Sequence, residues 1–91
     1  MSKILILYTM NGCPFCDDMK NRLNEENIEF TELDIHEYQE EYGLFKEITE
    51  NEYVPSFMVM DTNGLHGLYA PDRDYQDIKE GVEIIKRELL N

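Results

Sequence analysis

The chain has two cysteines, Cys13 and Cys16, and they are separated by a proline and a phenylalanine. Two thiols at this spacing can form and break a disulfide with each other, which is the chemistry of thiol-disulfide exchange. They could instead supply half of a zinc site, or remain inert thiols in the core. A zinc site would need His36 and His66 as its other ligands, and these lie in separate predicted elements. We interpret both histidines as surface residues and the cysteine pair as a redox site without a metal.

The cysteine pair lies between a predicted strand and a predicted helix. Residues 3–8 form a nearly unbroken apolar run, which is typical of a strand covered on both faces. Residues 14–26 then place apolar side chains on one helical face, and Pro14 suits the first turn of such a helix. A cysteine pair at a strand-to-helix junction is a far more specific redox signal than the spacing alone.

The helix assigns different roles to the two thiols. The attacking species in disulfide exchange is a thiolate, and the free N–H groups and dipole of a helix N-terminus stabilise that anion. Cys13 lies at or just before the first turn, whereas Cys16 lies one turn inside the helix. We therefore predict that Cys13 attacks the substrate disulfide and that Cys16 resolves the mixed disulfide.

Five further elements follow along the chain. They are a short edge strand within residues 28–35, a helix over 38–48, a strand over 56–60, a return strand over 65–68 and a helix over 75–89. In the first of these helices, Tyr38, Tyr42 and Phe45 are predicted to face the core. We expect one domain over residues 1–91, with the first three strands parallel and the last one antiparallel because an Asn-Gly turn precedes it.

The composition argues against some classes of partner. Twenty acidic residues against eight basic ones give a net charge of −12. Such a surface repels nucleic acid and anionic lipid, so we expect neither as a partner, and it favours basic protein surfaces. No apolar run approaches the roughly 18 residues of a membrane span, and no signal-peptide pattern is visible, so the predicted location is the cytoplasm.

Two segments resemble the glutaredoxin family. Residues 8–16, which read YTMNGCPFC, are similar to the family's active-site region, and residues 53–57 resemble its Thr-Val-Pro segment. The resemblance implies an α/β, thioredoxin-like fold with a central four-stranded mixed sheet flanked by helices. It also implies that Pro55 is cis and faces the cysteines, and that Val54 offers its backbone to an extended substrate. We assign Phe15 to the same substrate site, with a purely structural role as the alternative.

The resemblance implies a thiol-disulfide oxidoreductase that reduces protein disulfides or glutathione-mixed disulfides and holds no tightly bound cofactor. Ribonucleotide reductase is one candidate acceptor, and glutathione or a flavin-dependent thioredoxin reductase is the expected reductant. Met10 stands where many family members carry a lysine for glutathione, and residues 67–74 lack the usual Gly-Gly pair. These differences predict weak use of glutathione. A non-catalytic iron–sulfur carrier or interaction domain on the same fold is the alternative function.

Overall fold

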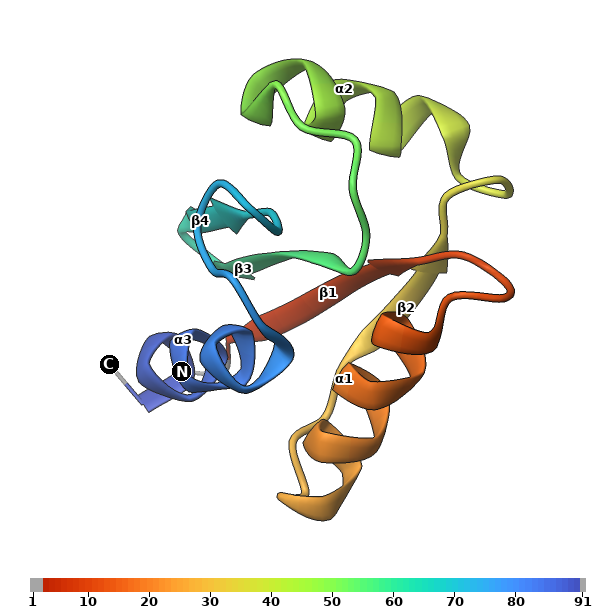
Figure 1. Ribbon diagram of the computed structural model, residues 1–91. Coiled ribbons are helices and arrows are strands. Elements are labelled where there is room, and N and C mark those ends of the chain that lie inside the picture. Colours follow the sequence, from red (N-terminus) through yellow and green to blue (C-terminus); the bar gives the residue numbers. More distant parts are fainter. Residues whose placement is uncertain (1–2, 91) are drawn as a thin grey trace.

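The computed structural model describes residues 3–90, which form a four-stranded sheet and three helices (Figure 1). In chain order the elements are β1 (Ile4–Thr9), α1 (Pro14–Glu25), β2 (Thr31–Asp34), α2 (Gln39–Thr49), β3 (Ser56–Asp61), β4 (Gly64–Tyr69) and α3 (Ile78–Leu90). The strands lie in the order β2-β1-β3-β4, which makes β2 an edge strand, as predicted. The predicted order of strands and helices is confirmed.

The direction of β3 differs from its prediction. β1 and β2 pair in parallel, but β1 and β3 pair antiparallel, with Tyr8 opposite Ser56. The first helix carries the chain back along the sheet, whereas α2 lies across the other face, so the chain enters β3 at the end where β1 finishes (Figure 1). This direction brings the residues before β3 to the same end of the sheet as Cys13. β4 pairs antiparallel with β3, as predicted.

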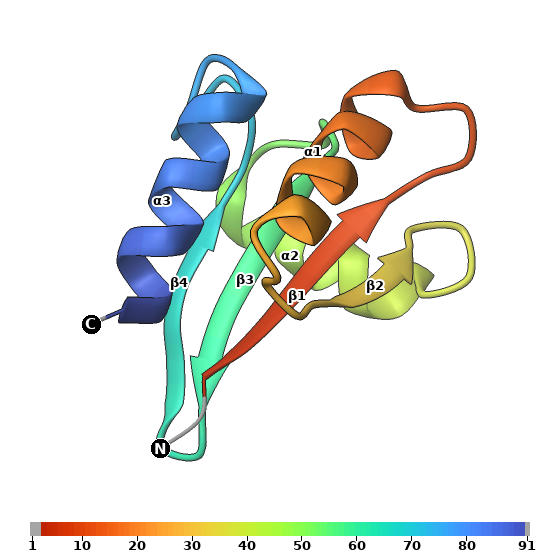
Figure 2. The ribbon, with the colours of Figure 1, turned by 90° about the horizontal axis from the view of Figure 1, so that it is seen from below.

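The helices divide the buried side chains into two clusters. α1 and α3 cover one face of the sheet and α2 covers the other (Figures 1 and 2). The cluster beneath α1 and α3 is the larger, and its members include Leu5, Leu7, Met19, Leu23, Phe57, Val59, Val82 and Ile85. The cluster beneath α2 is smaller and mostly aromatic, and consists of Tyr8, Tyr42, Phe45 and Ala70. Fewer buried side chains therefore hold α2 than hold the opposite pair of helices.

The inner face of α2 is rotated from its predicted position. Tyr42 and Phe45 are buried as predicted, but Tyr38 precedes the helix and is 39% exposed. Ile48, part of the predicted apolar stripe, also points outward. Thr49 takes the inner position instead, and its hydroxyl donates a hydrogen bond to the Phe45 carbonyl at 2.8 Å. The buried face follows the 3.6-residue helical repeat through Thr49, so Ile48 is turned toward solvent.

The last helix begins at Ile78, three residues later than its pattern predicted. Tyr75 lies ahead of it in the connecting segment and is nevertheless buried. At the other end of α3, the Glu88 carbonyl accepts a hydrogen bond from Lys3 Nζ at 2.5 Å, which joins the start of β1 to the end of the helix. No helix within residues 3–90 has the length and apolar character needed to cross a membrane.

Candidate active site

Cys13 and Cys16 form a disulfide at the N-terminus of α1. Gly12 turns the chain into the helix with a φ of 73°, a left-handed conformation that suits glycine. Cys13 is the N-cap residue, and Pro14 occupies the first turn, where its missing N–H leaves no bond unmade. The Cys13 Sγ accepts a hydrogen bond from the Cys16 backbone N–H at 3.1 Å. The sulfur of Cys13 therefore lies at the positive end of the helix dipole.

The two cysteines differ in their access to solvent. Cys13 is 6% exposed, whereas Cys16 is fully buried beneath the helix turn. This difference favours the predicted roles, in which Cys13 attacks and Cys16 resolves.

The Val54–Pro55 peptide bond is cis, as the resemblance implied. Pro55 is buried, and Val54 packs against the aromatic cluster beneath α2. The Pro55 carbonyl accepts a hydrogen bond from the Tyr75 hydroxyl. Burial raises the pKa of Tyr75 well above its usual value, so the hydroxyl stays protonated and able to donate.

Sequence reasoning missed Tyr75 as a residue that supports the site. Its position fits the apolar spacing of the last helix, so it was predicted to be part of that stripe. A usable signal was present, because a tyrosine at a buried position needs a partner for its hydroxyl. In the structure that partner is the carbonyl of Pro55, 20 residues earlier in the chain.

A groove of about 470 Å³ lies beside the disulfide loop. Its walls include the three residues predicted to contact substrate, namely Phe15, Val54 and Pro55. The facing wall comes from the segment between β4 and α3 and from the first turn of α3, with Pro71, Asp72, Tyr75, Gln76, Asp77, Ile78 and Lys79. The Phe15 ring is largely exposed, which fits contact with a substrate better than a capping role in the fold. The fold thus gathers the predicted substrate residues around one groove.

Asn51 ties together the two loops that flank this groove. Its side-chain Nδ2 donates to the Pro71 carbonyl at 2.8 Å, and its Oδ1 accepts from the Tyr53 backbone N–H at 2.9 Å. The first bond reaches the segment after β4, and the second holds the segment that leads to Pro55. The Asn51 side chain therefore links the two walls of the groove.

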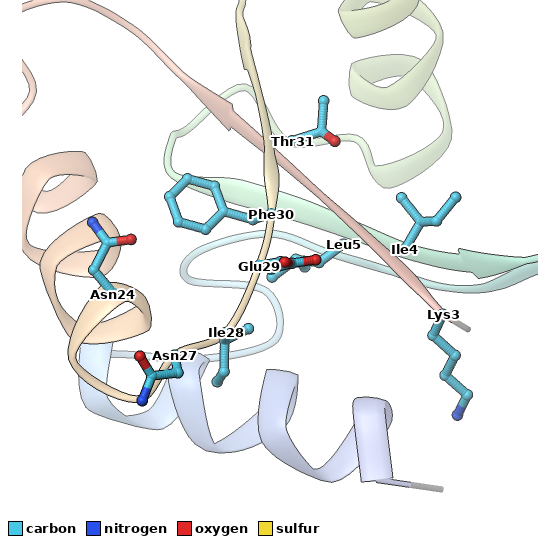
Figure 3. Close-up of a pocket in the computed structure, with 9 residues that line it drawn as sticks. All are labelled: Lys3, Ile4, Leu5, Asn24, Asn27, Ile28, Glu29, Phe30 and Thr31. Atoms are coloured by element: carbon cyan, nitrogen blue, oxygen red, sulfur yellow. The ribbon is translucent and has the colours of Figure 1, made fainter. Parts of the chain in front are cut away.

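A larger cavity, of about 760 Å³, lies at the other end of β1 (Figure 3). The start of β1, the end of α1 and the segment leading to β2 line it. Figure 3 shows amide, aliphatic and aromatic side chains around it, including Asn24, Asn27 and Phe30. Phe15 of the disulfide loop and the cis Pro55 line the smaller groove and not this cavity, so we assign the redox chemistry to the smaller groove.

Both basic residues of α1 already have acidic partners. Lys20 Nζ lies 3.0 Å from Glu32 Oε2, and Arg22 Nε lies 3.0 Å from Asp18 Oδ1. The Thr9 hydroxyl donates a hydrogen bond to Glu32, which lowers the pKa of that carboxyl, and Lys20 lowers it further. The hydrogen bond with Glu32 raises the pKa of Lys20. The field that stabilises a Cys13 thiolate therefore comes mainly from the helix N-terminus.

Arg73 and Asp74, which lie before α3, are also paired with each other. Arg73 Nη1 lies 3.0 Å from Asp74 Oδ2, and the same oxygen accepts a hydrogen bond from the Ala70 backbone N–H at 2.8 Å. The resemblance to glutaredoxins implied a glutathione contact in this segment. Here Arg73 binds Asp74, and Asp74 accepts a hydrogen bond from the backbone of the local turn.

The histidines lie apart from the cysteines. Both are exposed, and His66 Nε2 lies 2.6 Å from Asp61 Oδ2 at the hairpin between β3 and β4. Among the described residues, no group of three or more His, Cys, Asp and Glu side chains is placed to hold a metal ion.

Structural comparison relates this fold to thioredoxins and glutaredoxins. The oxidised thioredoxin of Plasmodium falciparum gives a TM-score of 0.65 at 13% identity, covering 97% of this chain and 82% of that one. The glutaredoxin of Brucella melitensis gives 0.57 at 19% identity, with coverage of 98% and 85%. Thioredoxin 1 of Thermosipho africanus TCF52B gives 0.58 at 17% identity, with coverage of 94% and 93%. At these identities the likeness establishes the thioredoxin-like fold alone.

Sequence comparison identifies the family. No curated protein sequence matches the chain significantly. The family model described as glutaredoxin matches residues 5–62, which is more than half of the chain. The matched stretch contains both cysteines and the cis proline, and it ends before residues 67–74. The chain therefore belongs to the glutaredoxin family, and its Cys13–Cys16 pair makes it a thiol-disulfide oxidoreductase.

Proposed function

We propose that this protein reduces disulfides in other proteins, with Cys13 as the nucleophile and Cys16 as the resolving thiol. One observation carries the proposal: Cys13 is the N-cap of α1 and borders the surface, while Cys16 is buried one turn further along. A thiolate at the N-cap is stabilised by the helix, and the buried thiol is protected from direct attack.

The exchange proceeds in two balanced steps. The Cys13 thiolate attacks one sulfur of the substrate disulfide, forms a mixed disulfide and expels the other substrate sulfur as a thiolate. The Cys16 thiolate then attacks the Cys13 sulfur and releases the second substrate thiolate. Two electrons pass to the substrate, and the protein is left with the intramolecular disulfide present in this structure.

The groove is the proposed binding site for the substrate. We infer that an extended segment of the substrate lies along Val54, whose backbone offers hydrogen-bonding groups next to Pro55. The exposed ring of Phe15 and the apolar floor of the groove would contact the side chain beside the substrate cysteine. A polypeptide fits these features because backbone pairing does not depend on the substrate's side chains.

We further propose that a flavin-dependent thioredoxin reductase, rather than glutathione, returns the electrons. Met10 offers no cation for a glutathione carboxylate, and the Arg73 and Asp74 side chains are engaged with each other. The net charge of −12 adds repulsion toward an anionic tripeptide. Such a redoxin fits a reducing compartment such as the cytoplasm, with ribonucleotide reductase as one candidate acceptor.

Trapping tests the proposed roles. Cys16→Ser should accumulate a mixed disulfide between Cys13 and a cysteine-containing peptide, detected by mass spectrometry, because the resolving thiolate is missing. Cys13→Ser should reduce no disulfide at all. Dithiol-dependent activity in Cys13→Ser would refute the mechanism. Inactivity of the wild type, together with visible absorbance from an iron–sulfur cluster in fresh protein, would favour the carrier function instead.

A second comparison tests the reductant. Oxidised protein is offered glutathione with glutathione reductase, or NADPH with thioredoxin reductase, and steady-state turnover is measured. We expect slow turnover with glutathione and a gain of about tenfold for Met10→Lys, because one charge-assisted contact is typically worth 1.5–3 kcal/mol. Met10→Gln, which adds polarity without charge, serves as the control. Fast wild-type turnover with glutathione and no gain from the lysine would show that other groups already hold the tripeptide.

A further inference from the structure

The outward face of α2 carries two large aliphatic side chains that are mostly exposed. Leu44 is 62% exposed and Ile48 is 67% exposed. A single exposed apolar residue is ordinary, but these two lie one helical turn apart and form a continuous stripe. We name this pair the α2 ridge. Tyr53, in the segment between α2 and Pro55, is similarly exposed.

Glutamates surround the α2 ridge. Residues 37–53 contain six of them against a single basic residue, Lys46, and they are Glu37, Glu40, Glu41, Glu47, Glu50 and Glu52. By helical spacing, Glu40, Glu41 and Glu47 lie on the outward half of α2 together with the ridge. Glu37 lies in the turn that enters the helix. No ion pair within residues 3–90 involves any of the six, in contrast to the paired carboxylates of α1. This face therefore presents an apolar centre inside an uncompensated acidic rim.

The same helix packs against one wall of the redox groove. Its inner side chains Tyr42 and Phe45 share a cluster with Val54, which lines that groove. Beyond the end of α2, Asn51 holds both flanking loops through its two hydrogen bonds. A protein that docks its disulfide at Cys13 can therefore meet a second surface on α2.

We propose that the α2 ridge and its acidic rim dock the protein whose disulfide is reduced, and that this partner presents an apolar contact ringed by lysine and arginine. The proposal rests on the proposed function for the identity of the partner as substrate. Opposite charge around an apolar centre speeds association and selects partners. A second copy of this chain, or an anionic membrane, would instead bring acidic groups against acidic groups.

Three synthetic disulfide peptides provide the probe. All carry the same short cystine-containing segment, and two of them add a helical arm through a linker of about 20 Gly/Ser residues, which spans roughly 25 Å. That reach is comparable to the 29 Å extent of the molecule. One arm has a leucine stripe flanked by lysines, and the other has the same stripe flanked by glutamates. The third peptide has no arm and reports the exchange chemistry alone.

The measurement is kcat/KM for each peptide with three proteins: wild type, the ridge variant Leu44→Gln/Ile48→Gln and the control Leu65→Gln. Leu65 is a matched residue because it is 57% exposed but lies on β4. We expect the wild type to favour the lysine arm over the glutamate arm by about tenfold at low salt. The ridge variant should lower kcat/KM for the lysine-armed peptide most of the way to that of the armless peptide, because the leucine stripe loses its apolar contact, and Leu65→Gln should not.

The peptides separate the two proposals. Equal kcat/KM for both armed peptides with the wild type would overturn the docking surface. So would an unchanged kcat/KM for the lysine-armed peptide in the ridge variant. In either case, reduction of the armless peptide leaves the proposed function intact. Failure to reduce the armless peptide would instead contradict the proposed function. A concentration-dependent dimer that disappears in the ridge variant, seen by sedimentation, would assign the ridge to a second copy and also overturn the proposal.

Discussion

At the scale of single residues, the site depends on an asymmetry between two chemically identical thiols. We predict that iodoacetamide at pH 7 labels Cys13 of the reduced protein at least about tenfold faster than Cys16. Cys13 meets the helix N-terminus and borders the surface, whereas Cys16 is fully buried. Mass spectrometry of the digested protein gives the two rates, and Cys13→Ser serves as the control for labelling at Cys16. Faster labelling of Cys16 would reverse the two assigned roles.

Tyr75 offers a second test at this scale. Tyr75→Phe keeps the ring but leaves the buried Pro55 carbonyl without its donor. We expect the free energy of unfolding to fall by about 1–3 kcal/mol, measured by chemical denaturation. Disulfide reduction should also slow, because the Pro55 loop forms one wall of the groove. Tyr38→Phe, at an exposed tyrosine, is the control, and equal stability of the two variants would remove Tyr75 from the supporting structure.

At the scale of elements, Glu32 on β2 links α1 to β1 through Lys20 and Thr9. These bonds hold the pKa of Glu32 below 4.5, with the Thr9 hydrogen bond as the largest cause. A carboxyl with a lowered folded-state pKa stabilises the fold above its unfolded pKa and loses that contribution as the pH falls through the folded value. We therefore expect the stability difference between wild type and Glu32→Gln to be constant above about pH 5 and to shrink below pH 4.5.

Urea denaturation between pH 3 and pH 7 measures this difference. Thr9→Val removes the strongest contact of Glu32, so its own stability should depend less on pH in the acid range than that of the wild type. A stability difference between wild type and Glu32→Gln that stays constant down to pH 3 would show that the observed contacts do not favour the charged carboxylate.

The sequence predicts where the elements lie along the chain better than it predicts their direction or rotation. The apolar runs and spacings predicted every strand and helix, and the cysteine pair was correctly placed at the N-terminus of α1. The direction of β3 was not predictable, because an alternating or apolar strand reads the same in both directions. Similarly, spacings of three and four residues allowed Ile48 on the inner face of α2, and Thr49 replaced it because packing against the sheet fixed the rotation.

The supporting contacts of the site were harder to predict than its cysteines. Cys13, Cys16 and the cis Pro55 lie in short recognisable motifs. The bonds from Tyr75 to Pro55 and from Asn51 to Pro71 each join residues 20 positions apart, and nothing local in the sequence marks either pair. Such contacts follow from the three-dimensional path of the chain, which the antiparallel β3 largely sets.

At the scale of the whole molecule, charge repulsion opposes folding. The chain has twenty acidic residues against eight basic ones, and this is more negative charge than the observed ion pairs neutralise. We predict that about 0.2 M sodium chloride raises Tm by several degrees, since screening weakens repulsion between surface charges and 1 kcal/mol corresponds to roughly 4–8 °C for a domain of this size. Scanning calorimetry measures the shift. A fall in Tm would mean that the ion pairs contribute more than the repulsion removes.

The hydrogen bond between Lys3 and the Glu88 carbonyl has a consequence for protein engineering. It brings the start of β1 and the end of α3 together, and β1 runs from there toward the start of α1 (Figure 2). A short linker could join these two neighbouring ends, and the chain could be reopened in the hairpin turn at Asn63, where the residue is exposed. Such a circular permutant would keep every buried contact of the redox end while changing the order in which its parts are synthesised.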